Sequence, residues 1–139
     1  MENLTATICL TLAVLLGSAG EGWSADFQKG VDAYNRGDYA TALREWKPLA
    51  QQGHADAQFN LGVMYEKGRG VPQDDKTAVK WLTLAAKQGD ARAQYNLGWM
   101  SDKGRGTPQD YKNALKWYRL AAEQGYAPAQ KNLNYSKMK

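Results

Sequence analysis

The feature that most constrains this chain is a 36-residue segment that occurs twice in succession. Residues 55–90 and 91–126 are identical at 23 of 36 positions, and residues 127–139 begin a further copy with the letters APAQKNLN. A repeat of roughly 20 to 50 residues is typical of solenoids, in which each unit buries its apolar face against its neighbours. We therefore expect the function of this chain to depend on surfaces rather than on one enclosed pocket.

Each full copy has the pattern of two helices joined by a loop. In its first half, apolar side chains recur at helical spacing: Ala57, Leu61, Met64 and Tyr65. Two glycines and a proline at 68–72 then break the helix. Asp74 is placed to cap a second helix, and the Gln88-Gly89 pair is placed to end it. Asp90 is expected to cap the next helix.

A glycine inside the first helix of both copies predicts close packing. Glycine in a helix interior costs about 1 kcal/mol relative to alanine. Because the position is glycine in both copies, as Gly62 and Gly98, we expect a neighbouring backbone to lie close to it.

A shorter unit precedes the two full copies. Residues 26–54 keep the pattern but lack the long loop, so their two helices are expected to meet at an Arg36-Gly37-Asp38 turn. The partial copy at 127–139 adds one helix as a terminal cap. The sequence therefore predicts an all-α solenoid at 26–139, with about seven helices in units 26–54, 55–90, 91–126 and 127–139.

Residues 1–25 have features of an export signal. Ile8–Leu16 is an apolar run too short for a bilayer span but typical of a signal peptide. Small residues after it allow cleavage after Ala19 or Ala25. Lys29 is the first basic residue, so only the amino terminus supplies positive charge, and a buried N-terminal helix is the alternative. We expect residues 1–25 to be removed, leaving a periplasmic or secreted chain without a membrane span.

The composition offers little for catalysis. Cys9, the single cysteine, lies in the predicted signal, so the mature chain would have neither a disulfide nor a catalytic thiol. His54 is the single histidine and is expected to start a helix rather than act as a base. Ser136 and Lys139 match a Ser-x-x-Lys motif by chance, without a surrounding pocket. We expect no enzymatic activity, no catalytic residue, no cofactor and no metal site.

The motifs resemble the SEL-one-like repeat (SLR) family. The residues that carry the resemblance are the ADAQFNLGVM, GRGVPQD, AVKW and LAAKQG segments of the first full copy and their counterparts in the second. Unit 26–54 is similar to a tetratricopeptide repeat through Gly30, Gly37, Tyr39, Ala42 and Trp46. The resemblance implies a right-handed α/α superhelix that serves as a scaffold or adaptor for protein contacts, often in exported bacterial proteins. It also implies that the first helix of each hairpin lines the concave surface.

The polar stripe of these first helices supplies the candidate partner-binding residues: Asp56, Phe59, Asn60, Val63, Lys67, Arg92, Tyr95, Asn96, Trp99 and Lys103. Asn132 and Tyr135 continue the row. Asparagine recurs at the full period, where it could grip a peptide backbone, but we favour a structural role for residues present in every copy. Positions that differ are better ligand candidates. Trp99 is the strongest of them, although it could also pack on the next hairpin.

Two alternatives to a protein or peptide partner remain open. From Asp26 onward, 18 basic residues face 12 acidic ones, a net charge of +6. The outer stripe of the second helices is basic, and with Arg69 and Arg105 it could bind an anionic envelope polymer or lipid: Lys76, Lys80, Lys87, Lys112, Lys116 and Arg119. Nucleic acid is not expected, because no aromatics interleave this stripe. A wall-active hydrolase, third, would need a cleft joining His54 to a carboxylate.

Overall fold

A computed structural model describes residues 24–137, with side chains placed as far as Tyr135. This part of the chain forms seven helices and no strands: α2 (Phe27–Asn35), α3 (Tyr39–Gln51), α4 (Ala55–Lys67), α5 (Asp75–Lys87), α6 (Ala91–Lys103), α7 (Tyr111–Glu123) and α8 (Ala127–Lys137). The predicted all-α, seven-helix solenoid is confirmed. Cys9 and most of the predicted signal segment, as far as residue 23, lie outside the described residues.

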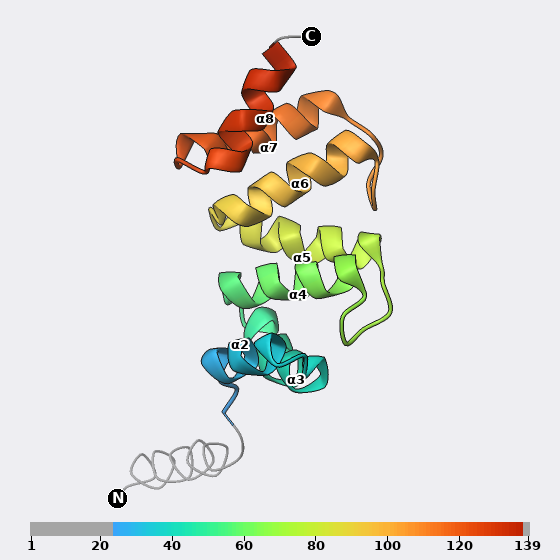
Figure 1. The fold of residues 1–139 in the computed structure, drawn as a ribbon, viewed down its shortest axis with the longest axis vertical. Coiled ribbons are helices and arrows are strands. Elements are labelled where there is room, and N and C mark those ends of the chain that lie inside the picture. Colours follow the sequence, from blue (N-terminus) through green and yellow to red (C-terminus); the bar gives the residue numbers. More distant parts are fainter. Residues whose placement is uncertain (1–23, 138–139) are drawn as a thin grey trace, which may run out of the picture.

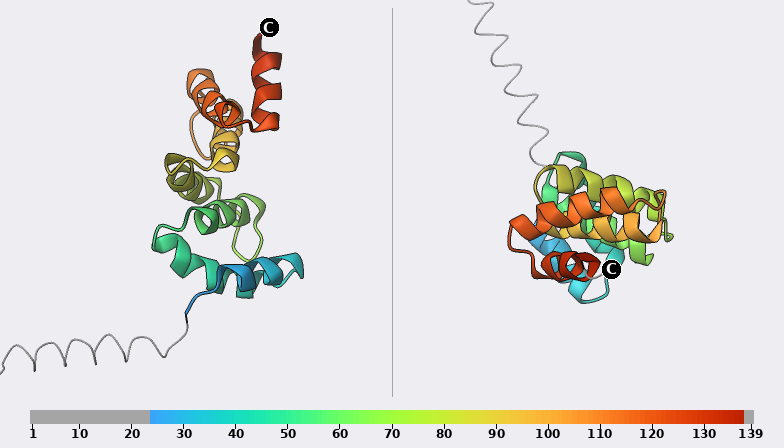
Figure 2. Two further views of the ribbon diagram at one scale, coloured as in Figure 1. Left: turned by 90° about the vertical axis from the view of Figure 1, so that its left-hand side faces the viewer. Right: turned by 90° about the horizontal axis from the view of Figure 1, so that it is seen from above.

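Successive hairpins stack into one elongated column. Each helix packs chiefly on the helices before and after it in the chain, and α2 and α8 lie at opposite ends (Figures 1 and 2). The interior contains small residues that let helices approach closely and larger ones that fill the gaps between them. One core cluster joins α2, α3 and α4: Ala33, Ala42, Trp46, Ala50, Ala57, Leu61 and Met64. A second joins α5 and α6: Ala78, Leu82, Ala85, Ala86, Ala93, Leu97 and Met100.

The helix ends follow the predicted caps. The carboxylates of Asp74 and Asp90 accept hydrogen bonds from backbone N–H groups in the first turns of α5 and α6. His54 does the same for α4, because its Nδ1 accepts from the N–H of Ala57 at 3.2 Å. Gly89 has a φ of 95°, the left-handed conformation expected after α5. The sequence thus specified where these helices begin and end.

The two helical glycines lie close to the backbone of a neighbouring helix as predicted, but their shortest contacts are with its side chains. A Cβ on Gly62 would lie 2.6 Å from Cγ of Leu82, and one on Gly98 would lie 2.7 Å from the ring of Tyr118. The nearest backbone atoms, carbonyl oxygens of the same second helix, would be 3.4 and 3.2 Å away. Glycine is therefore required by a side chain of the paired helix more than by its backbone.

Glutamine side chains connect each unit to the next. Gln58 is buried, and its Nε2 donates to the Ala50 carbonyl oxygen at 3.0 Å. Its Oε1 accepts from Nε2 of Gln88 at 2.8 Å. Both bonds recur one unit later through Gln94 and Gln124. An unpaired buried amide would be costly, and these bonds satisfy the amides of Gln58 and Gln94 in the same way at two successive unit boundaries.

Candidate interaction groove

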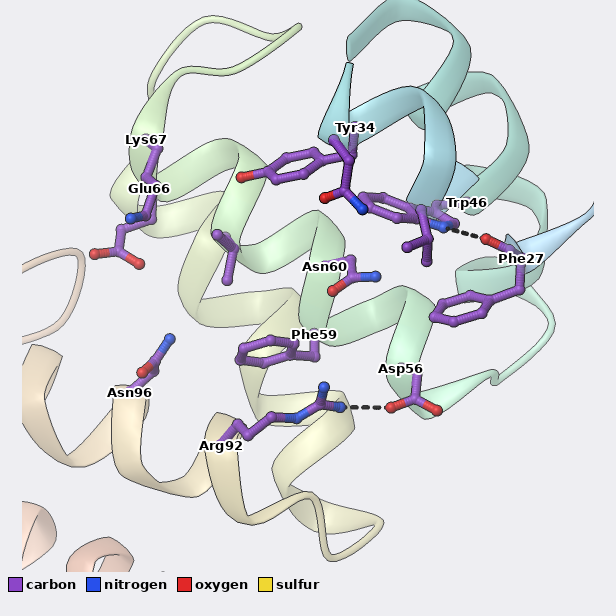
Figure 3. Close-up of a pocket in the computed structure, with 13 residues that line it drawn as sticks. Phe27, Tyr34, Trp46, Asp56, Phe59, Asn60, Glu66, Lys67, Arg92 and Asn96 are labelled. Carbon is purple, nitrogen blue, oxygen red and sulfur yellow. Dashed lines mark hydrogen bonds and ion pairs between the residues drawn. The ribbon is translucent and has the colours of Figure 1, made fainter. Parts of the chain in front are cut away.

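A groove of about 670 Å³ runs across the first helices of three successive units. One wall is aromatic and comes from α2, α3 and α4: Phe27, Tyr34, Trp46 and Phe59. Polar residues of α4 and α6 line the rest, and they point into the same space (Figure 3). We call this the concave groove. Its mixture of an apolar wall and amide groups suits a peptide better than a small ion.

The structure brings most of the sequence candidates together here. Seven of the ten line the concave groove: Asp56, Phe59, Asn60, Val63, Lys67, Arg92 and Asn96. The other three line a second pocket of about 360 Å³ between α6, α7 and α8: Tyr95, Trp99 and Lys103. Asn132 and Tyr135, which continue the row in the sequence, also border this second pocket.

Sequence reasoning missed the contribution of the first unit. Phe27, Val31 and Asn35 line the concave groove, although they were not among the predicted residues. A sequence signal was available, because Gly30 lies inside the first helix of its unit as Gly62 does, and the structure confirms that the two are equivalent, with Gly30 against Trp46 and Gly62 against Leu82. Aligning these two glycines places Phe27 on Phe59, Val31 on Val63 and Asn35 on Lys67.

Arg92 and Asp56, which differ between the copies, bind each other. Nη2 of Arg92 lies 2.5 Å from Oδ1 of Asp56 (Figure 3). It also lies 2.5 Å from Oδ2 of Asp90. The guanidinium stacks over the Phe59 ring at 4.3 Å. Hydrogen bonds to Asp90, and then to Asp56, raise the pKa of Arg92 above its ordinary value. Arg92 thus forms part of the groove floor with its charge already neutralised.

The asparagines that recur at the repeat period are not equivalent. Asn132 hydrogen-bonds Tyr118, which is the structural role we favoured. The side-chain amides of Asn60 and Asn96 form no hydrogen bond to any residue within 24–137, and both face the concave groove. For these two, the hydrogen bond to a neighbouring helix or loop that a structural role would use is not formed within the described residues. Each leaves a donor and an acceptor available on the groove surface.

Comparison with known proteins identifies the repeat. A sequence model of the family described as Sel1 repeat matches residues 55–90 and 91–126, more than half of the chain. The chain belongs to the Sel1 repeat family. Sel1 repeats form helical scaffolds without catalytic machinery, and they generally mediate protein–protein interactions. The resemblance to SLR proteins is thereby confirmed.

Solved structures share the Sel1 stack. A Sel1 repeat protein from Oxalobacter formigenes has a TM-score of 0.76 and 36% identity, covering 79% of this chain and 45% of that one. The protective antigen c5321 of uropathogenic Escherichia coli strains, with an SLR fold, has a TM-score of 0.74 and 39% identity, covering 78% and 24%. Cysteine rich protein B of Helicobacter pylori has a TM-score of 0.62 and 20% identity, covering 75% of this chain and 89% of that one. It shares the fold alone.

Curated relatives match over shorter segments. DAP3-binding cell death enhancer 1 of Rattus norvegicus is 38% identical over 50 residues, which are 36% of this chain and 10% of that protein. The exopolysaccharide production negative regulator of Rhizobium leguminosarum bv. viciae is 37% identical over 54 residues, 39% of this chain and 20% of that protein. The matched Sel1 segment thus spans only a tenth to a fifth of these relatives.

Trp99 of the second full Sel1 unit packs against the preceding hairpin rather than the next one, and its role as a ligand anchor stays a prediction. Its half-buried ring packs against the second core cluster, and the guanidinium of Arg105 lies 5.1 Å from the ring centroid. It also borders the second pocket. Arg105 in turn donates to Asp75 through Nε at 3.0 Å and Nη2 at 2.8 Å.

The outer basic stripe of the Sel1 units is smaller than predicted. Arg69 donates to the Tyr34 hydroxyl at 2.6 Å, and Arg105 is held by Asp75, so both loop arginines are committed to the fold. The stripe on α5 and α7 is exposed, and no member forms an ion pair within the described residues: Lys76, Lys80, Lys87, Lys112, Lys116 and Arg119.

His54 is confirmed as a helix-start residue of the first full Sel1 unit. Its Nδ1 is occupied by the Ala57 N–H, and its ring stacks on Phe27 at 4.9 Å. Within residues 24–137, no three His, Cys, Asp or Glu side chains cluster closely enough to hold a metal ion. In the same part of the chain, no helix has the length and hydropathy needed to cross a bilayer.

Proposed function

We propose that this Sel1 repeat protein is an adaptor that binds an extended segment of a partner protein in the concave groove. The observation that supports this most directly is the pair of unbonded amides, Asn60 and Asn96, which lie one repeat apart and face the same space. Both residues are half-buried, so their amides can exchange water for the hydrogen-bonding groups of a ligand.

The groove chemistry matches an extended peptide. Such a peptide presents backbone N–H and C=O groups on one side every two residues, so amides on successive units can bind the same edge. The half-buried rings of Phe27 and Phe59 on the aromatic wall give an apolar side chain a place to bury. Lys67 forms no ion pair within the described residues, so it offers a cation at the end of α4.

The binding test compares two double variants against a purified partner. The partner is identified by affinity capture and mass spectrometry, and its dissociation constant is then measured by calorimetry. Asn60→Ala with Asn96→Ala should weaken binding about 10- to 100-fold, because two peptide hydrogen bonds are lost. Lys80→Ala with Lys116→Ala, on the outer stripe, is the matched control and should change little. Equal affinity of wild type and the asparagine variant would refute binding in the groove.

A second candidate is binding of an anionic envelope polymer or lipid by the outer basic stripe. It is favoured by six exposed cations without ion pairs in the described chain. This mode requires affinity that falls steeply with salt and is lost in the Lys80→Ala, Lys116→Ala variant. Titration of vesicles containing anionic lipid at low and high salt separates it from groove binding.

We also propose that the protein acts outside the cytoplasm and has no enzymatic activity. Export is supported by the nine-residue apolar run Ile8–Leu16 and the small residues that follow it. The absence of activity is supported by His54, whose Nδ1 is engaged as a helix cap. Cell fractionation tests the location, and a protein found only in the cytoplasm would contradict it.

A further inference from the structure

The first unit contains a buried carboxylate whose surroundings are incomplete. The side chain of Glu45 on α3 is 1% exposed, and its Oε2 accepts from the backbone N–H of Asp26 at 3.0 Å. Oε1 is enclosed and accepts no hydrogen bond within residues 24–137, although Nζ of Lys29 lies 3.2 Å away. Because Lys29 is half exposed, water competes for that ammonium. The Asp26 N–H and then Lys29 hold the pKa of Glu45 below its usual value, but Oε1 depends on this half-exposed ammonium alone.

The repeat itself does not require a carboxylate at this position. One and two periods later, the equivalent residues are Trp81 and Trp117, which are half-buried aromatics. Glu45 therefore replaces a packing residue in the first unit alone. Helix α2 is also special, with nine residues where α4 and α6 have thirteen, so it begins one turn late. Glu45 accepts a hydrogen bond from the backbone nitrogen of Asp26, and Asp26 is the residue that caps the late-starting helix α2.

We infer that Glu45 is the acceptor for a free amino terminus at Asp26, produced by hydrolysis of the Ala25–Asp26 peptide bond. In that step water adds across the bond: its oxygen ends in the carboxylate of Ala25, and the Asp26 nitrogen takes up both of its hydrogens as protons. The resulting ammonium has three N–H groups where the amide has one, so it can donate to both oxygens of Glu45. The inference rests on the proposed export, because export brings the chain to a signal peptidase. The position of the cut is inferred from the place of Glu45 beside the Asp26 nitrogen.

Trp23 and the dipole of helix α2 both act against an amino terminus at Asp26, and each has a compensating feature. Trp23 stands third before the cut, where signal peptidases prefer a small residue. Cleavage after Ala19 followed by trimming reaches the same product, because the last bond broken is again Ala25–Asp26. A positive charge at a helix start also opposes the helix dipole. The carboxylates of Asp26 and Glu45 both lie beside that charge and offset it.

The first experiment identifies the mature amino terminus. The full chain is expressed in an exporting bacterial host, and the protein in the periplasmic fraction is sequenced by mass spectrometry. An amino terminus at Asp26 is the expected result. One at Gly20 in exported protein overturns the inference and leaves export intact. An uncleaved chain retained in the cytoplasm overturns export and processing together.

The second experiment tests the role of Glu45 with chains that contain all seven helices. One begins at Asp26, and its control begins at Ser24 and so keeps an amide at Asp26. At pH 7 the Asp26 chain should melt roughly 3 to 6 °C higher, the shift typical of one hydrogen-bonded ion pair in a domain of this size. In the Glu45→Gln background the difference should vanish. Equal melting temperatures, or a difference that persists in Glu45→Gln, would refute the role.

The pH dependence provides an independent readout. An α-amino group has a pKa of about 8 when unfolded, and Glu45 would raise it in the folded chain. The advantage of the Asp26 chain is therefore full below about pH 7 and lost as pH rises through the raised pKa. Lys29, Arg44 and the Asp26 carboxylate also lie beside this site, and His54 stacks on the neighbouring Phe27, but both chains share them. An advantage that stays constant to pH 11 would contradict an ammonium.

Discussion

Replacing Gly62 by alanine sets helix propensity against packing. Alanine is favoured over glycine in a helix interior by about 1 kcal/mol. Its Cβ, however, would lie 2.6 Å from Cγ and 2.8 Å from Cδ2 of Leu82, a fully buried side chain. Because Cγ is the branch point, relief requires moving the whole side chain or the helix. Overpacking costs roughly 1–3 kcal/mol, and contacts this short belong near the top of that range. We expect a net loss of about 1–2 kcal/mol.

Gly98 provides the matched comparison. A Cβ there would lie 2.7 Å from the Tyr118 ring, but that ring borders the second pocket instead of being enclosed on all sides like Leu82. We expect Gly98→Ala to cost less than about 1 kcal/mol, since the propensity gain offsets a softer clash. Urea unfolding followed by circular dichroism measures both variants.

The decisive control removes the clash. In a Leu82→Ala background, Gly62→Ala should become neutral or stabilising, because the obstructing atoms are gone. If Gly62→Ala costs as much in that background as in wild type, or if Gly98→Ala costs at least as much as Gly62→Ala, the packing explanation is wrong.

Two further predictions concern charge and pH. Asp56→Asn should lower the free energy of unfolding by less than about 1 kcal/mol, because its ion pair with Arg92 is exposed. Arg92→Ala should cost more, since it also leaves the buried Asp90 carboxylate without its partner; equal urea midpoints for the two variants would contradict this. Burial raises the pKa of Tyr118 to about 12 from an unfolded value of about 10, so the folded chain holds this proton more tightly. Stability should therefore fall as pH rises above about 10, and Tyr118→Phe should reduce that fall. Thermal unfolding from pH 9 to 11.5 checks it, and the same alkaline slope in both proteins would exclude Tyr118 as the cause.

The fold was largely predictable because its determinants are local and repeated. The caps at His54, Asp74 and Asp90 and the glycine after α5 were each visible as single residues in a pattern that occurs twice. Local signals of this kind fix where helices begin and end. The side-chain contact at Gly62 was not predictable in the same way, since it depends on how closely two helices approach.

The groove was predictable only in part, because a stack joins residues one period apart. Asp56 and Arg92 were considered as separate ligand candidates, yet positions 36 residues apart are neighbours in space and these two pair with each other. Ser101, which replaces Tyr65 in the second copy, is likewise buried and accepts from Nδ2 of Asn113 at 2.9 Å. Some differences between the copies are therefore pairs of residues that contact each other, and only the others are groove residues available to a ligand.

The glutamine connections have a consequence for how such a protein can change in length. Gln58 and Gln94 bond a carbonyl eight residues back, and Gln88 and Gln124 reach a glutamine thirty residues back. A duplicated 36-residue copy placed after Asp90 would therefore form the same glutamine hydrogen bonds at both new boundaries. Evolution can lengthen or shorten the surface offered to a partner in whole units by gene duplication or deletion, without inventing a new interior each time.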